Sequence, residues 1–180
     1  MDELVVRTEV YAPQQEVYDL LEDLERYDQY SEHLRRVRRF DGDGGAGTRY
    51  ALEFAWWKLT YTAHSEVTDV DPPDRIDWRI TKDIDAHGQW RVESTDGDGN
   101  RGEDGDETVC EVVFEVNFDP GSANSGALDL PLMVSFDWVL SKAIPLFQTE
   151  AERIVERAVA DLEGRERDVD LDVRVDSDHI

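Results

Sequence analysis

Short segments in which apolar and polar residues alternate run through the middle of the chain. In the clearest of them apolar side chains take every second position, at Val112, Phe114, Val116 and Phe118. A period of two places these side chains on one face of a β-strand. Such one-sided alternation is typical of an antiparallel sheet that is covered on a single face. The chain must therefore supply a cover for one large sheet.

A helical pattern near the end of the sequence supplies that cover. One apolar stripe at helical spacing is made by Phe147, Ala151, Ile154, Val155, Ala158 and Leu162. Pro145 interrupts the pattern upstream, because proline lacks the N–H that an interior helical position donates. We therefore predict a first helical piece at about residues 132–142 and a main helix over residues 145–162, with Gly164 as its stop.

The other segments complete an α+β architecture. A strand is predicted at residues 4–11, followed by one short helix after Pro13 and a second at about residues 25–34. Further strands are predicted near residues 35–40, 49–56, 58–70, 76–80, 89–93 and 111–118. We expect a helix-grip fold, with a curved antiparallel sheet of about six to seven strands wrapped around the long C-terminal helix. The alternating tail at residues 169–175 is either an edge strand or a solvated tail.

The chain is strongly acidic, with 43 Asp and Glu against 19 Lys and Arg and a formal net charge of -24. Such a surface repels phosphate, which excludes nucleic acid and anionic lipid headgroups as expected partners. Salt screens the self-repulsion of the carboxylates, so the composition predicts a halophilic protein. The five Trp, six Tyr and six Phe argue against intrinsic disorder.

The sequence also predicts a cytoplasmic location. No apolar run approaches the roughly 18 residues of a membrane-spanning helix, so we expect no stable membrane insertion. The first residues lack the basic and apolar regions of a signal peptide. The single cysteine, Cys110, excludes an intramolecular disulfide and a thiolate zinc cluster.

Two motif-like stretches are not expected to bind a cofactor or a metal. Residues 42–47 match G-x-G-x-x-G, but a strand follows where a dinucleotide site needs a helix N-terminus, so a hairpin turn is predicted. Residues 96–107 match a calcium-loop spacing, but Arg101 stands where the loop needs glycine. The four histidines show no metal-ligand spacing. The prediction is therefore no cofactor and no metal.

His64 and His87 are the weak catalytic candidates. Both lie in predicted strands, and on an inner face either could hydrogen-bond a ligand or act as a general acid-base. Histidines in strands are more often ordinary surface residues, and no full catalytic set is predicted.

Aromatic side chains are concentrated in the predicted strands, at Tyr50, Phe54, Trp56, Trp57, Tyr61, Trp78, Trp90, Phe114 and Phe118. They have two interpretations. Aromatics dominate core burial, so they can simply fill a packed core. A strongly curved sheet closed by one helix also tends to leave a hollow, and aromatic walls suit an apolar ligand.

Three stretches resemble the SRPBCC (START-like) superfamily, in particular its polyketide cyclase/dehydrase and lipid-transport branch. Residues 12–27, APQQEVYDLLEDLERY, look like the family opening A-P-x-x-x-V-[WY]-x-x-L-x-D-x-x-x-[YW]. Residues 71–78, DPPDRIDW, look like its proline turn into a central strand, and residues 151–164 look like its closing helix. The resemblance implies a START-like ligand-binding domain at residues 1–163 and an acidic C-terminal tail at residues 164–180.

The same resemblance implies binding or carriage of a hydrophobic small molecule, such as a lipid, a quinone or a polyketide-like compound. We expect a cavity between the sheet and the C-terminal helix, lined by Phe54, Trp56, Trp78, Trp90, Phe114, Phe136, Leu140 and Phe147. These assignments depend on register, because a slip of one residue turns every strand side chain over. The alternatives are a polyketide cyclase/aromatase-type enzyme that uses a cavity histidine, and a protein-binding adaptor.

Overall fold

The computed structural model describes residues 1–56, 59–95, 109–123 and 136–177, and for residues 59 and 136–148 it describes the backbone alone. The chain begins with strand β1 (Asp2–Val10), helix α1 (Gln14–Glu22) and the 3-10 helix η1 (Leu24–Gln29). The strands that follow are β2 (Leu34–Asp41), β3 (Arg49–Trp56), β4 (Leu59–Asp71), β5 (Arg75–Ile80), β6 (Asp85–Ser94) and β7 (Cys110–Asp119). After these come the 3-10 helix η2 (Pro120–Ser122), helix α2 (Phe136–Glu163) and strand β8 (Asp172–Asp176).

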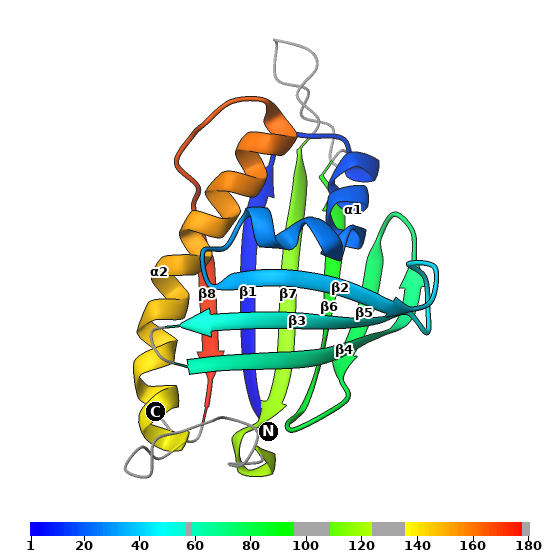
Figure 1. Cartoon of the computed structure of the whole chain (residues 1–180). Helices are drawn as coiled ribbons and strands as arrows, with labels where there is room; N and C mark the ends of the chain where they lie inside the picture. The colour runs from blue at the N-terminus through cyan, green and yellow to red at the C-terminus, as the bar shows by residue number, and fades with distance from the viewer. Residues whose placement is uncertain (57–58, 96–108, 124–135, 178–180) are drawn as a thin grey trace, which may run out of the picture.

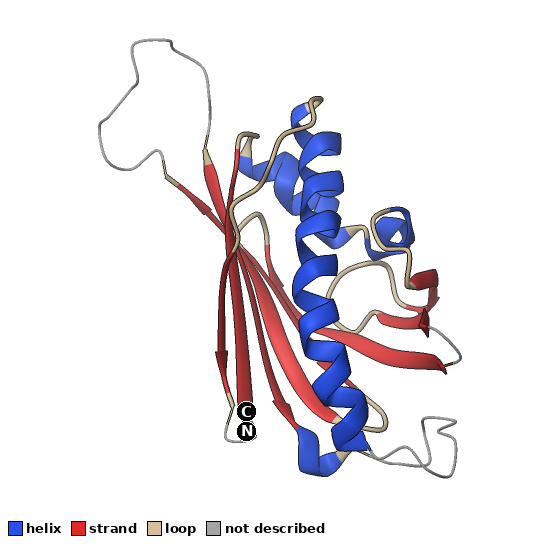
Figure 2. Cartoon of the chain, turned by 90° about the vertical axis from the view of Figure 1, so that its left-hand side faces the viewer, coloured by secondary structure: helices blue, strands red, loops and turns tan. Residues whose placement is uncertain are grey.

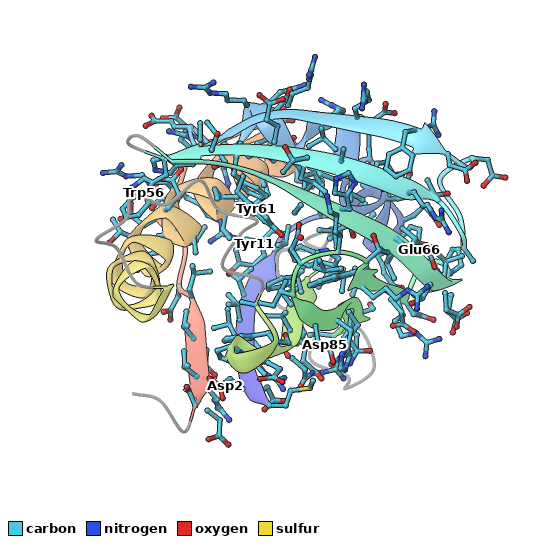
Figure 3. All side chains as sticks on the ribbon, turned by 60° about the horizontal axis from the view of Figure 1, so that its bottom comes forward. Asp2, Tyr11, Trp56, Tyr61, Glu66 and Asp85 are labelled. Carbon is cyan, nitrogen blue, oxygen red and sulfur yellow. The ribbon has the colours of Figure 1, made fainter. Side chains whose placement is uncertain are left out.

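One antiparallel sheet holds all of these strands, in the order β2-β3-β4-β5-β6-β7-β1-β8. Consecutive strands pair from β2 to β7, and β1 pairs with both β7 and β8. The sheet is curved, and α2 lies along its concave face (Figures 1 and 2). The predicted helix-grip fold is therefore confirmed. The sheet is larger than the six to seven strands expected. Of the two alternatives for the tail, an edge strand or a solvated segment, the structure has the edge strand, β8.

Helix α2 passes through Pro145 as one continuous helix from Phe136 to Glu163. The predicted break between two helical pieces is therefore wrong, and residues 132–135 of the first piece lie outside the described residues. A proline removes one backbone hydrogen bond of a helix, but here the turns on both sides remain helical. The predicted stop is confirmed, since Gly164 adopts φ 71° and its N–H donates to the Ala160 carbonyl at 2.9 Å.

The glycine-rich stretch at residues 42–47 is the turn between β2 and β3, as predicted. Gly42 has φ 91°, and a Cβ at this position would lie 2.5 Å from Cα of Thr48. The Thr48 side chain is fully buried, and its Oγ1 accepts a hydrogen bond from the Gly44 N–H at 2.9 Å. The positive φ and the close approach of Thr48 require glycine at the first position of this turn.

Helices α1 and η1 close one end of the fold. Helix α1 directs Val17, Tyr18 and Leu21 into the interior, where all three are buried. They pack in one core cluster with Val10, Tyr50, Val67, Ile76, Val92, Cys110 and Val112 from the sheet and Val159 from α2. The second helix was predicted over residues 25–34, but η1 is a shorter 3-10 helix because β2 already begins at Leu34.

Ion pairs cover the convex face of the sheet. Glu66 on β4 accepts hydrogen bonds from Arg49 on β3 and Arg79 on β5, each at 3.0 Å. The hydrogen bond from Arg49 is the largest cause that lowers the pKa of Glu66, and the Arg79 guanidinium adds to it. Other pairs between neighbouring residues of this face are Arg7–Glu111, Arg36–Glu53, Arg75–Asp77 and Arg91–Glu93.

In the part of the chain that the structure describes, no helix combines the length and the apolar character needed to span a membrane.

Candidate functional site

Strand register places the predicted aromatic side chains on the concave face. Directly paired residues of antiparallel strands share a face, and Trp90 is paired with Ile76 on β5 and with Phe114 on β7. Ile76 belongs to the core that packs against α1 and α2, so this face points toward the helices. The same parity holds for the other predicted strand residues, Phe54, Trp56 and Trp78.

Burial on this face is lower at three central aromatic residues than beside α1. Ile76, Val92 and Cys110 are at most 3% exposed. Further along the same strands, Trp78, Trp90 and Phe114 are only partly buried. A side chain in the middle of a sheet, under a helix, keeps accessible surface only where the packing leaves space, because protein interiors are otherwise close-packed. The partial exposure of Trp78, Trp90 and Phe114 makes these three rings the candidates for contact with a ligand.

Three of these aromatic rings form a continuous wall. Phe114 stacks on Trp78 with ring centroids 5.8 Å apart and an interplanar angle of 11°. Trp90 lies on the other side of Phe114, with centroids 4.4 Å apart and an angle of 40°. Gly88, paired directly with Trp78, makes room for the indole, since a Cβ there would lie 2.7 Å from its Cζ2. This wall can offer flat apolar contact. Among the described residues, no hydrogen-bond partner is found for Nε1 of Trp78, one of its two indole nitrogens, which is buried.

Contacts between α2 and the segment that joins η1 to β2 hold the helix over the closed end. The Tyr30 hydroxyl donates to Oδ2 of Asp161 at 2.6 Å, and Arg26 lies 3.6 Å from the same carboxylate. Arg157 donates to the Tyr30 carbonyl at 2.8 Å and to Glu32 at 3.2 Å. Burial is the largest cause that raises the pKa of Tyr30 to about 12, and the hydrogen bond to Asp161 raises it further. We call these contacts the α2 clasp.

Glu150 of α2 is a buried acid that sequence reasoning did not single out. The residue is 9% exposed, and its Oε1 has no hydrogen-bond partner among the residues that the structure describes. Its Oε2 lies 4.0 Å from Nε2 of His33, which precedes β2. A buried carboxylate is costly unless it is paired, so this position is a second place where the interior has unused hydrogen-bonding capacity. Nothing in the sequence spacing distinguishes Glu150 from the exposed acids of the same helix.

The two histidine candidates are not on the concave face, which corrects the expectation that they could face the interior. His64 is paired with Ala51 and His87 with Asn117, and both pairs lie on the convex face. His64 contacts the ring of Phe40 edge to face at 6.1 Å, and His87 is exposed. The physical reason is the two-residue period of a strand, because His64 lies three positions from Tyr61 and His87 three positions from Trp90, an odd number that turns each histidine to the opposite face.

Part of the predicted site lies outside the described residues. The side chains of Phe136, Leu140 and Phe147 belong to the first turns of α2, for which the backbone alone is described. The acidic stretch at residues 96–107 also lies outside. Within the residues that are described, no group of three or more His, Cys, Asp or Glu side chains could hold a metal ion.

A polar cleft of about 370 Å³ lies beside the junction of β1 and β8, away from the aromatic wall. Arg167 crosses it, donating to the Glu9 carbonyl at 2.9 Å and lying 4.7 Å from the ring centre of Tyr11. The cleft is lined by Arg7, Thr8, Glu9, Tyr11, Glu111, Arg167, Asp168, Asp170 and Asp172. Its charged lining does not suit an apolar ligand, so the concave face remains the candidate site.

The pattern of the sequence over residues 10–133 matches the family described as polyketide cyclase / dehydrase and lipid transport. The chain belongs to this family. The matched region runs from the end of β1 through β7 and includes all five strand residues of the candidate site, Phe54, Trp56, Trp78, Trp90 and Phe114.

Solved structures with the same fold come from distant organisms. The Zhui aromatase/cyclase from a Streptomyces species superimposes with a TM-score of 0.62 at 15% identity, covering 91% of this chain and 94% of that one. Ginseng major latex-like protein 151 from Panax ginseng gives a TM-score of 0.60 at 9% identity, with 89% and 96% covered. The protein TTHA0849 from Thermus thermophilus gives 0.58 at 19% identity, with 90% and 97% covered. No curated protein gives a significant sequence match.

Proposed function

We propose that this member of the polyketide cyclase/dehydrase and lipid-transport family binds or carries a hydrophobic small molecule between the concave face and α2. The proposed ligands are a lipid, a quinone or a polyketide-like compound. The observation that carries the proposal is the partial exposure of Trp78, Trp90 and Phe114 in the middle of a sheet whose closed end is fully packed. Aromatic walls of this kind are typical of pockets for apolar ligands.

The aromatic wall offers shape and apolar area to a ligand. Fully burying one large apolar side chain or a ligand fragment of similar size contributes about 1.5–3 kcal/mol. Several ring contacts along the wall would therefore give useful affinity without any charged anchor.

The enzyme alternative loses the group on which it depended. A cyclase that uses a cavity histidine needs that histidine beside the bound chain, whereas His64 and His87 lie on the opposite face of the sheet. The Zhui aromatase/cyclase shares the fold, but at 15% identity this likeness concerns architecture alone. Binding or carriage is therefore preferred to catalysis.

The adaptor alternative is not supported as the main role. It required an exposed apolar patch of several hundred Å². Among the described residues the large hydrophobic side chains that are exposed are Met1, Phe40 and Val175, which come from three different segments.

Organic extraction and native mass spectrometry of protein purified in high salt test the proposal. We expect a retained apolar compound in the extract, and a matching mass increment on the intact protein. The variant Val116→Trp fills the hollow from β7, where Val116 is partly buried on the concave face. We expect it to retain at least tenfold less ligand.

The matched control is Thr62→Trp, which places the same bulk on the exposed convex face of β4. This variant should retain the ligand at the wild-type level. The proposal would be contradicted if the wild-type protein carried no apolar compound and also bound no lipid, quinone or aromatic polyketide added at micromolar concentration.

A further inference from the structure

Strand β2 carries a basic stretch on an otherwise acidic protein. Four of the 19 basic residues of the chain, Arg35, Arg36, Arg38 and Arg39, lie within its eight positions. All four are exposed. With a formal net charge of -24, such a local excess of positive charge is unusual for this chain and is not needed for the ligand site.

Among the described residues, two of the four guanidinium groups have no ion-pair partner. Arg36 pairs with Glu53 at 3.3 Å, and Arg39 lies 3.7 Å from Glu25. Among the described residues, Arg35 and Arg38 form no ion pair or side-chain hydrogen bond. Structural ion pairing therefore accounts for half of the basic stretch and leaves Arg35 and Arg38 without a structural role.

Two register shifts between β2 and β3 leave two residues of β2 unpaired. The register between β2 and β3 shifts between Leu34 and Arg36, and again between Arg39 and Asp41. Arg35 and Phe40 are consequently left without a paired residue on β3. Such bulges re-aim side chains and are frequent at sheet edges, where β2 lies.

Phe40 is the exposed aromatic side chain of this surface. It is 49% exposed, and its ring meets His64 of β4 edge to face at 6.1 Å. Arg38 lies on the same convex face, since it is paired with Ala51, which is itself paired with His64. Phe40, Arg38 and His64 thus form one continuous surface, which Arg35 extends along β2. We call these four residues the β2 arginine patch.

We propose that the β2 arginine patch docks an acidic polypeptide segment that carries an exposed apolar side chain. Arginine and aromatic residues are the types enriched at protein interfaces. The guanidinium fork matches a carboxylate with two parallel hydrogen bonds. Two free guanidinium groups beside one exposed ring therefore fit a short epitope with about two carboxylates and one apolar residue.

The charge of the whole protein favours a short epitope over an extended polyanion. A membrane surface or a nucleic acid would meet the carboxylates around the patch as well as the patch itself, and they would repel it. At about 1 M salt the screening length falls to about 3 Å, so distant repulsion disappears while direct contacts remain. The bulges at Arg35 and Phe40 also interrupt the edge of β2, which opposes addition of a further strand.

Fluorescence anisotropy with a fluorescein-labelled peptide EDEWEDE, in 1 M KCl, tests the docking surface. We expect saturable binding that weakens at least tenfold in the variant Arg35→Glu/Arg38→Glu and at least threefold in Phe40→Ser. The peptide EDEGEDE, which lacks the apolar residue, should bind at least threefold more weakly than EDEWEDE. Circular dichroism establishes that each variant is folded.

The matched control is Lys82→Glu/Arg174→Glu, which changes the net charge by the same amount at two exposed positions, one in the turn after β5 and one on β8 at the opposite edge of the sheet from β2. It should bind the peptide within twofold of the wild type. Equal losses in both double variants would overturn the proposal, because binding would then follow net charge alone. The proposal would also be overturned by patch-dependent binding of phosphatidylglycerol vesicles without peptide binding, or by patch-dependent self-association in light scattering.

Discussion

Tyr30 shows how single residues set the pH range of the fold. Its hydroxyl is held by Asp161 of α2, and burial with this hydrogen bond raises its pKa from 10.0 to about 12. The folded state therefore favours the neutral hydroxyl. A group whose pKa is raised in the folded state adds to the free energy of unfolding. The full amount is present below the unfolded-state pKa, and it is lost as the pH rises through the folded-state pKa. For Tyr30 this window runs from about pH 10 to about pH 12.

The variant Tyr30→Phe should therefore be less stable than the wild type at pH 8 and should lose this disadvantage in alkali. Removing one hydrogen bond to a charged group costs about 1.5–3 kcal/mol. We expect the difference in unfolding free energy, measured with urea at several pH values, to shrink between pH 10 and pH 12.

Tyr11→Phe is the comparison variant, because its ring contacts Arg167 outside the α2 clasp. It should follow the wild-type pH profile. If the Tyr30→Phe difference were the same at pH 8 and pH 12, the hydroxyl would not be the titrating group that stabilises the clasp.

The sequence predicts which strand side chains share one face of the sheet, but it does not predict the polar contacts between elements. The alternation along β3, β5, β6 and β7 places Phe54, Trp78, Trp90 and Phe114 on one face, and the register agrees. Alternation along β4 and β6 places His64 and His87 on the other face, so an interior role for them could have been excluded from the sequence pattern. Glu150 became visible only through tertiary packing, because its burial depends on the chain around His33.

Among the elements, β8 is the one that the sequence alone could least decide, because the tail could be a strand or a solvated segment. Its alternation of Val173 and Val175 with charged residues suits a strand, but a strand forms only where a partner edge is available. β1 provides that edge, with Val173 paired to Val6 and Val175 to Leu4. The continuity of α2 through Pro145 has the same origin, since surrounding structure overrides a local preference. Whether the tail counts as a separate unit from residues 1–163 stays a prediction.

Truncation of the chain before Asp172 should expose the edge of β1. Loss of the two valine contacts and the strand pairing should cost about 2 kcal/mol of unfolding free energy. Hydrogen exchange should show faster exchange of those amides between Glu3 and Arg7 that point toward β8, whereas the alternate amides that point toward β7 stay protected.

The single substitution Arg174→Ala, on an exposed side chain of β8, serves as the control and should leave these amides protected. Unchanged protection of β1 in the truncated chain would mean that β8 does not hold this edge in solution.

The whole molecule combines an acidic exterior with an apolar concave face. Ion pairs on the convex face neutralise some carboxylates, but the excess of 43 acids over 19 bases remains. Each exposed ion pair adds little to the free energy of unfolding. Weakening these pairs with salt should therefore lower the stability by less than screening of the overall repulsion raises it. Halophilic adaptation, which the composition predicts, stays a prediction that stability measurements can address.

We expect the melting temperature to rise steadily between 0.1 M and 2 M KCl. Each 1 kcal/mol of relieved repulsion should raise it by about 2–4 °C for a chain of this length. Differential scanning calorimetry measures the shift, and sucrose at matched osmolality separates screening from solute exclusion. A melting temperature that falls with KCl would show that the ion pairs, rather than the repulsion, dominate the electrostatics.

The pairing of β8 with β1 joins segments that are about as far apart in the sequence as this chain allows. Residues 3–7 are synthesised some 170 residues before their partners at 172–176. β1 therefore waits with both edges open until β7, and then β8, has been synthesised. Contacts of such long sequence separation slow folding, and unpaired edges favour aggregation in the interval. The charged residues along β1, such as Glu3 and Arg7, are well placed to keep that strand soluble during synthesis.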